Sequence, residues 1–79
     1  MKGLRPSTLR FLLWQTARRG GAFATISLIG GWPSLEDIEA LERCWSRNLQ
    51  RRAKLAEPPL VSANVRHTGD AVVITLGGR

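Results

Sequence analysis

The sequence contains little cysteine and histidine and no long apolar run. Cys44 is the only cysteine and His67 the only histidine, which excludes an internal disulfide and a metal site built from several cysteines. A single thiol fits the reducing cytoplasm, which is the expected location. No apolar run approaches the ~20 residues that a membrane span needs, so no membrane contact is expected. Residues 1–79 are expected to form one domain, too small to hold a substrate pocket with catalytic groups, so we predict neither an enzyme nor a cofactor.

Acidic residues are few, and they are placed unevenly. Residues 1–35 contain five bases and no acid, residues 36–42 contain four acids and no base, and residues 43–54 contain five bases and no acid. In total, 12 Lys and Arg against 6 Asp and Glu give a formal net charge of +6. An excess of this size favours an anionic partner, although charge kept for solubility would look the same.

Two segments have the apolar spacing of helices. The first covers about residues 7–19, with Ser7 as N-cap and Gly20-Gly21 as the stop. The second begins at Ser34, where Asp37 three residues later resembles a capping box, and it is expected to fray or bend beyond about residue 52. Its buried stripe consists of Ile38, Leu41, Trp45 and Leu49.

The remaining segments include one ambiguous stretch and one hairpin. Residues 22–29 contain β-branched residues that favour a strand, but the spacing of the turn that follows favours a short helix, which we predict here. Leu60–Val65 and Ala71–Leu76 are strand-like runs, and the polar residues 66–70 between them contain Gly-Asp, which indicates a β-hairpin. Residues 77–79 are expected to form a disordered tail.

The stretch from Ile26 to Arg43 has the spacing of a helix-turn-helix. It places a small residue at Ser27, a sharp turn at Gly31, and apolar residues at Ile26, Trp32, Ile38 and Leu41. With the hairpin, the predicted order is helix, helix, helix, strand, strand. The chain therefore resembles the winged helix-turn-helix family of DNA-binding domains over most of residues 7–76. The resemblance implies a mostly α fold with a small β-hairpin (α+β), and a second motif helix that approaches DNA.

The strongest signal for function is a row of basic residues on the second predicted helix. At about 100° per residue they fall within about 80° of one another, on a face away from the apolar stripe. A row of this kind meets successive phosphates, whereas a solvated helix face is the ordinary alternative. The row consists of Arg43, Arg47, Arg51 and Lys54.

Further candidates lie outside this helix. Arg18 and Arg19, at the end of the first helix, are predicted to flank the same surface, and the helix dipole explains them equally well. Arg66 at the predicted tip of the hairpin matches the basic wing residue of the family. Single residues of other types were assigned to structure: the tryptophans to the core, Cys44 to a small apolar position beside it, and His67 to the loop without a metal-binding role.

These features predict a small basic protein that binds double-stranded DNA mainly through its backbone. Without an effector pocket it would regulate transcription by occupying a site, with a homodimer as the expected form. Size and charge resemble those of the small regulators that phages and mobile elements encode. A phage-type inhibitor or adaptor that docks on an acidic host protein is the alternative, and an RNA partner is the third possibility.

Overall fold

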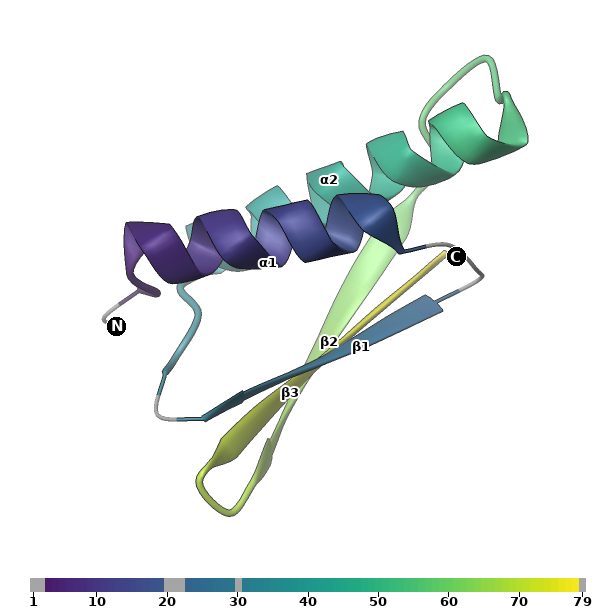
Figure 1. Cartoon of the computed structure of the whole chain (residues 1–79). Helices are drawn as coiled ribbons and strands as arrows, with labels where there is room; N and C mark the ends of the chain where they lie inside the picture. Colours follow the sequence, from purple (N-terminus) through teal and green to yellow (C-terminus); the bar gives the residue numbers. More distant parts are fainter. Residues whose placement is uncertain (1–2, 20–22, 30, 79) are drawn as a thin grey trace.

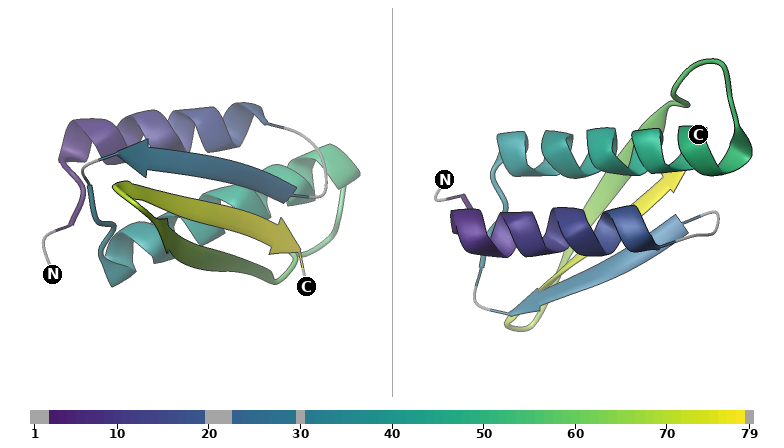
Figure 2. Two further views of the ribbon diagram at one scale, coloured as in Figure 1. Left: turned by 90° about the horizontal axis from the view of Figure 1, so that it is seen from below. Right: turned by 45° about the horizontal axis from the view of Figure 1, so that its top comes forward.

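The chain folds into two helices over one face of a three-stranded antiparallel sheet. The computed structural model describes residues 3–19, 23–29 and 31–78. The elements follow in the order α1 (Pro6–Arg18), β1 (Phe23–Ile29), α2 (Leu35–Ala53), β2 (Val61–Thr68) and β3 (Ala71–Gly78) (Figure 1). The strand order is β1-β3-β2. Both helices lie on the same face of the sheet, and within the described residues no helix covers the opposite face (Figure 2).

The α+β class is confirmed, but the predicted helix over residues 22–29 is wrong. Its described part is β1, which pairs with β3 along its whole length. Ile26 is buried, whereas Thr25 and Ser27 are exposed, so the segment has the two-residue alternation of a strand. β-Branched residues and a partner strand far along the chain outweigh the turn spacing. Because no helix precedes the turn before α2, the predicted helix-turn-helix does not form.

The first helix begins one residue earlier than predicted. Pro6 occupies the first helical turn and Arg5 the N-cap position, and Ser7 lies inside the helix, so its predicted role as N-cap is wrong. Proline suits this position because its missing N–H would have no partner there. The helix ends at Arg18, and the predicted Gly20-Gly21 stop lies outside the described residues.

The predicted start of α2 at Ser34 is confirmed. The Asp37 backbone N–H donates to Ser34 Oγ at 3.2 Å, and the Ser34 N–H donates to Asp37 Oδ2 at 2.9 Å, which forms a reciprocal capping box. Asp37 Oδ2 also accepts from the Leu4 N–H at 2.8 Å, so one carboxylate fixes the segment before α1 against the start of α2. Burial raises the pKa of Asp37, but the hydrogen bonds from Leu4 and Ser34 together hold it below its ordinary value.

Asp37→Asn is expected to destabilise the fold by about 1–3 kcal/mol at neutral pH, because an amide cannot accept both bonds as strongly as a carboxylate. A group whose pKa is lowered by folding contributes stability above its unfolded value, near 3.8, and loses this contribution as pH falls below that value. Urea unfolding of both proteins at pH 7 and at about pH 3 measures this difference. Equal midpoints at pH 7 would refute the role of the carboxylate.

The core lies between the helices and the sheet. It contains Leu12, Ile26, Leu41, Trp45, Val72, Ile74 and Leu76. Leu41 and Trp45 have no exposed surface, which confirms the centre of the predicted stripe, whereas Ile38 is half-buried. The Trp45 indole N–H is buried and finds no acceptor among the described residues, so part of the gain from burying this ring is lost.

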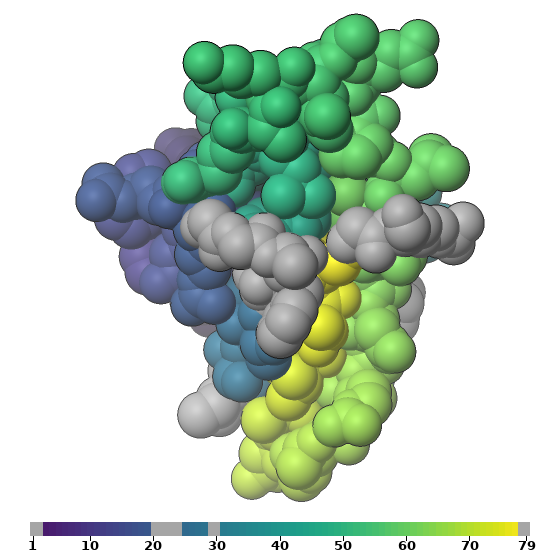
Figure 3. Space-filling view, turned by 90° about the vertical axis from the view of Figure 1, so that its right-hand side faces the viewer, coloured from purple at the N-terminus to yellow at the C-terminus, as the bar shows by residue number. Residues whose placement is uncertain are grey.

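The hairpin is longer than predicted, and its turn is tighter. β2 continues to Thr68 and β3 begins at Ala71, so only Gly69 and Asp70 form the turn, with Gly69 at a φ of 60°. β3 lies between β1 and β2 (Figure 3). Because β3 extends through Gly78, residues 77 and 78 are part of the sheet and not of the predicted tail, whereas Arg79 lies outside the described residues.

Side chains cap both edges of the sheet. On β1, Arg19 Nη1 donates to the Thr25 carbonyl at 2.8 Å. On β2, the Ala63 N–H donates to Glu42 Oε2 at 3.0 Å. A sheet edge with unpaired backbone groups invites pairing with another chain, and these two contacts reduce that tendency.

Polar side chains of α2 complete the C-terminal end of α1. Asn48 is buried and donates through Nδ2 to the carbonyls of Thr16, at 3.3 Å, and Arg19, at 2.6 Å. Arg52 donates to Asn48 Oδ1 at 3.1 Å and to the Arg18 carbonyl at 2.9 Å. Terminal carbonyls of a helix need such donors, and a cation there also suits the helix dipole. α2 itself ends at Ala53 and the backbone turns at Lys54, which confirms the predicted bend beyond about residue 52.

Arg52→Ala is expected to lower the free energy of unfolding by about 1–2 kcal/mol, because it removes a donor from the end of α1. Arg51→Ala is the matched control and is expected to stay within about 0.5 kcal/mol, as for surface substitutions in general. Urea denaturation measures both. Equal losses in the two variants would show that Arg52 does not hold the helices together.

Candidate functional site

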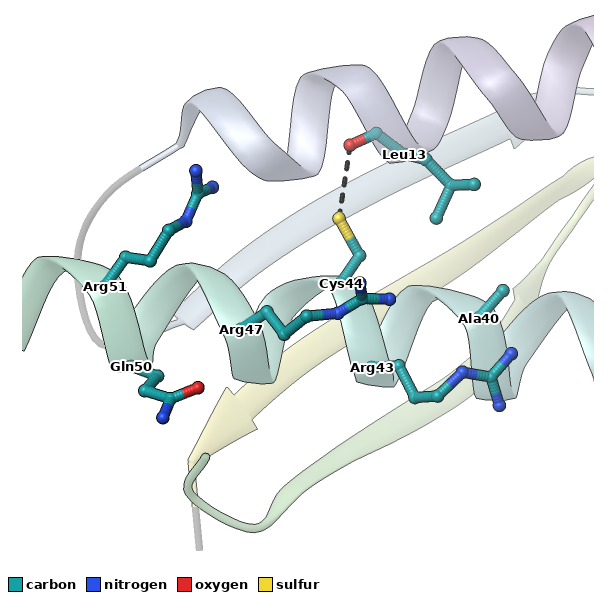
Figure 4. Close-up of a pocket in the computed structure, with 7 residues that line it drawn as sticks. All are labelled: Leu13, Ala40, Arg43, Cys44, Arg47, Gln50 and Arg51. Carbon is teal, nitrogen blue, oxygen red and sulfur yellow. Dashed lines mark hydrogen bonds between the residues drawn. The ribbon is translucent and has the colours of Figure 1, made fainter. Parts of the chain in front are cut away.

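The predicted arginine row is present on the outer surface of the helix layer. Arg43, Arg47 and Arg51 project from the flank of α2 that faces α1 and solvent (Figure 4). They line an open groove of about 630 Å³ between the helices, with Leu13 on the α1 side. Arg47 and Arg51 form no ion pair within the described residues, whereas Arg43 lies 4.0 Å from Glu39. At this separation, and with both side chains exposed to solvent, Glu39 neutralises the charge of Arg43 only weakly.

Lys54 does not continue the row as predicted. α2 ends at Ala53, and Lys54 is its C-cap residue with a left-handed φ of 54°. The prediction placed Lys54 in the row by assuming that the helix continues through residue 54, whereas it ends one residue earlier. Lys54 is exposed at the end of α2, where its charge still adds to the basic surface.

α1 presents the predicted Arg18 on its exposed side, together with one cation and two aromatic rings, Arg10, Phe11 and Trp14, that were not predicted there. The Arg18 guanidinium lies 4.9 Å from the centre of the Trp14 ring. The predicted core position of Trp14 is wrong, because 55% of it is exposed. At about 100° per residue, Trp14 lies on nearly the opposite side of the helix from Leu9 and Leu12, and this spacing could have predicted its exposure.

The other predicted basic residues have structural roles or lie elsewhere. Arg19 donates one hydrogen bond to the edge of β1 and remains exposed, so its flanking role stays a prediction. Arg66 is not at the tip of the hairpin. It lies within β2 opposite Val73, one position from the Val65–Ile74 pair that faces the core. Successive strand residues point to opposite faces, so Arg66 lies on the face of the sheet away from the helices. A partner bound flat against the arginine row would therefore not reach Arg66.

Cys44 lies at the floor of the groove. It is half-buried, and its thiol donates to the Leu13 carbonyl at 3.4 Å (Figure 4). Burial raises the pKa of this thiol by more than Arg47 and Arg51 lower it, so it stays protonated at neutral pH. Protonated thiols are weak nucleophiles, which agrees with the predicted packing role of Cys44.

Trp32 and His67 lie together, and His67 is not in the loop of the hairpin as predicted but in β2, opposite Val72. Trp32 and His67 are both exposed, with ring centres 4.0 Å apart. The predicted core position of Trp32 is therefore wrong, since 54% of it is exposed. Residues 3–19, 23–29 and 31–78 contain no group of three or more His, Cys, Asp or Glu side chains that could hold a metal ion.

Charge is distributed unequally along the helix layer. Glu36 and Glu39 are exposed in the first turns of α2, where they suit the positive end of the helix dipole. The arginine row occupies the following turns, and α1 contains no carboxylate. The excess of positive charge therefore lies on α1 and on the later turns of α2, away from the acidic start of α2.

Comparison with protein-family models, with curated proteins and with solved structures finds no match. No helix in the described part of the chain is both long and apolar enough to cross a membrane. The function is therefore inferred from the residues and their arrangement.

Proposed function

We propose that the chain binds double-stranded DNA through the outer surface of its helix layer, mainly by contacts to the phosphate backbone. The observation that supports this proposal is the exposed row of Arg43, Arg47 and Arg51 on one flank of α2. Residues four apart on a helix are about 6 Å apart along its axis, so the row spans about 12 Å. One strand of B-DNA presents a phosphate about every 3.4 Å along its axis, so the row covers about three to four phosphates.

Arg10 and Arg18 are exposed on α1, the other helix of the layer, and add to its positive charge. As in the winged-helix family, a long helix is followed by a hairpin. We do not propose, however, that a helix of this chain reads the major groove. α1 lies alongside α2 and the start of α2 is acidic, so α2 is poorly suited to enter a groove with its first turns. Regulation would then follow from occupying a site, with two copies providing more contacts than one.

A protein-binding module is the second candidate, because Phe11 and Trp14 are each more than half exposed. Exposed aromatic rings occur often in protein interfaces. An acidic host protein would be attracted by the same arginines. The two candidates differ in whether a random DNA duplex is bound at all, and in how strongly salt weakens the binding.

Binding to a random DNA duplex is expected to depend steeply on salt. Three to five phosphate contacts predict a slope of log K against log salt of about −2.7 to −4.5, which is a loss of roughly 40-fold to 500-fold in affinity between about 50 and 200 mM salt. Fluorescence anisotropy of a labelled duplex measures this slope. No binding at low salt, or an affinity that hardly changes with salt, would refute the proposal and favour the acidic protein partner. Competition with structured RNA separates the third possibility.

A further inference from the structure

We propose that the aromatic cluster on α1 stacks against unpaired bases, so that the preferred ligand is a nucleic acid with a single-stranded segment. This inference rests on the proposed nucleic-acid binding and names the form of ligand that the surface recognises. The cluster consists of Phe11, Trp14 and the guanidinium of Arg18. It lies on the exposed side of α1, and none of its three members lines the groove of the arginine row.

The geometry of the rings supports stacking. Phe11 and Trp14 are 54% and 55% exposed, with ring centres 6.0 Å apart and an angle of 23° between their planes. The two faces are thus nearly parallel, and Arg18 lies over the Trp14 ring at 4.9 Å. An exposed ring that already accepts a planar guanidinium offers a flat apolar surface that a base can occupy in the same way.

The surroundings of the rings favour an anionic chain over an apolar partner. An open hollow of about 540 Å³ is lined by Ser7, Arg10, Phe11 and Trp14. Arg10 beside the rings can bind the phosphate of a nucleotide whose base lies in this hollow. α1 contains no carboxylate that would repel this phosphate. The arginine row on α2 then provides contacts for the neighbouring paired segment.

Other uses of the cluster agree less well with this surface. Self-association through this cluster would bring together two chains that each have a net charge of +6, so they would repel each other. A membrane interface would bury the rings, but the cations of Arg10 and Arg18 lie directly beside them. Both remain possible outcomes of the test below.

The test compares Trp14→Leu with Trp14→Phe. Leucine keeps the apolar surface but has no ring face, whereas phenylalanine keeps the face. We expect Trp14→Leu to weaken binding of single-stranded oligothymidine by about fivefold or more, with little change for a fully paired duplex. Trp14→Phe should retain most of the affinity. Trp32→Leu is the control, because Trp32 is 54% exposed in the loop before α2 and has no part in the cluster.

Each alternative result overturns the inference in a recognisable way. If Trp14→Leu and wild type bind oligothymidine equally, the rings do not stack on bases, and the duplex proposal still stands. If wild type binds neither form at low salt, the proposed function fails with it. Binding of wild type to vesicles with anionic lipid, unchanged in Trp14→Leu, together with no preference for unpaired DNA, would assign the cluster to a membrane. Sedimentation that shows dimers lost in Trp14→Leu, without any effect on DNA affinity, would assign it to self-association.

Discussion

Replacing Arg47 and Arg51 together by glutamate is expected to abolish duplex binding and leave the fold intact. Both side chains line the groove on the outside of the helix layer, and neither forms an ion pair within the described residues. A hydrogen bond to a charged group contributes about 1.5–3 kcal/mol, so the loss of two such contacts predicts a decrease in affinity of roughly 100-fold or more. Repulsion between the new carboxylates and phosphates adds to this decrease. The salt slope should also become smaller by about two.

Anisotropy titrations with a labelled duplex measure both quantities, and circular dichroism measures whether the fold is kept. The urea midpoint of this double variant should stay near that of wild type, because the contacts that hold α1 to α2 come from Asn48 and Arg52. Wild-type affinity in a folded double variant would exclude the arginine row as the binding surface.

Trp45→Asp is expected to unfold the domain, and Trp45→Ala to destabilise it by about 3–5 kcal/mol. The side chain has no exposed surface and lies at the centre of the core between α2 and the sheet. At about 0.05–0.15 kcal/mol per residue, a domain of 79 residues has a total stability of about 4–12 kcal/mol. Removal of the indole ring therefore costs between about a quarter and all of this stability.

Trp45→Phe tests the same position with less disruption. It removes the indole N–H that has no acceptor among the described residues, so it should cost much less than alanine. Trp32→Ala is the matched exposed control and should change the unfolding free energy by less than about 1 kcal/mol. Chemical denaturation followed by circular dichroism compares wild type with Trp45→Ala, Trp45→Phe and Trp32→Ala. An alanine variant as stable as wild type would mean that Trp45 is not at the centre of the core.

The start of α2 and its buried face could be predicted because the signals are local. Ser34 and Asp37 are three residues apart, and Leu41 and Trp45 are four apart, so each pair is positioned by the helix itself. The arginine row follows from the same geometry. Lys54 is the exception, because the left-handed backbone at the C-cap cannot be derived from helical periodicity.

β1 could not be assigned from local spacing because its identity depends on a distant partner. Ile26 pairs with Ile74, and no short window of sequence contains both. Arg66 was predicted at the tip of the hairpin because the first strand was expected to end at Val65. Since β2 continues to Thr68, the alternation of a strand places Arg66 on the face away from the helices. Arg18 was predicted beside the arginine row, whereas Arg10, Phe11 and Trp14 were missed because their exposure depends on how α1 packs against α2, through Asn48 and Arg52.

Position on the surface, and not the total charge, is what we infer to determine DNA binding. Arg47→Glu and Arg66→Glu change the net charge equally, but Arg47 lies on the helix layer and Arg66 on the opposite face of the sheet. The most direct test compares the duplex affinity of these two single variants at the same low salt. We predict a loss of roughly tenfold or more for Arg47→Glu and a much smaller one for Arg66→Glu. Equal losses, or a larger one for Arg66→Glu, would contradict a binding surface on the helix layer.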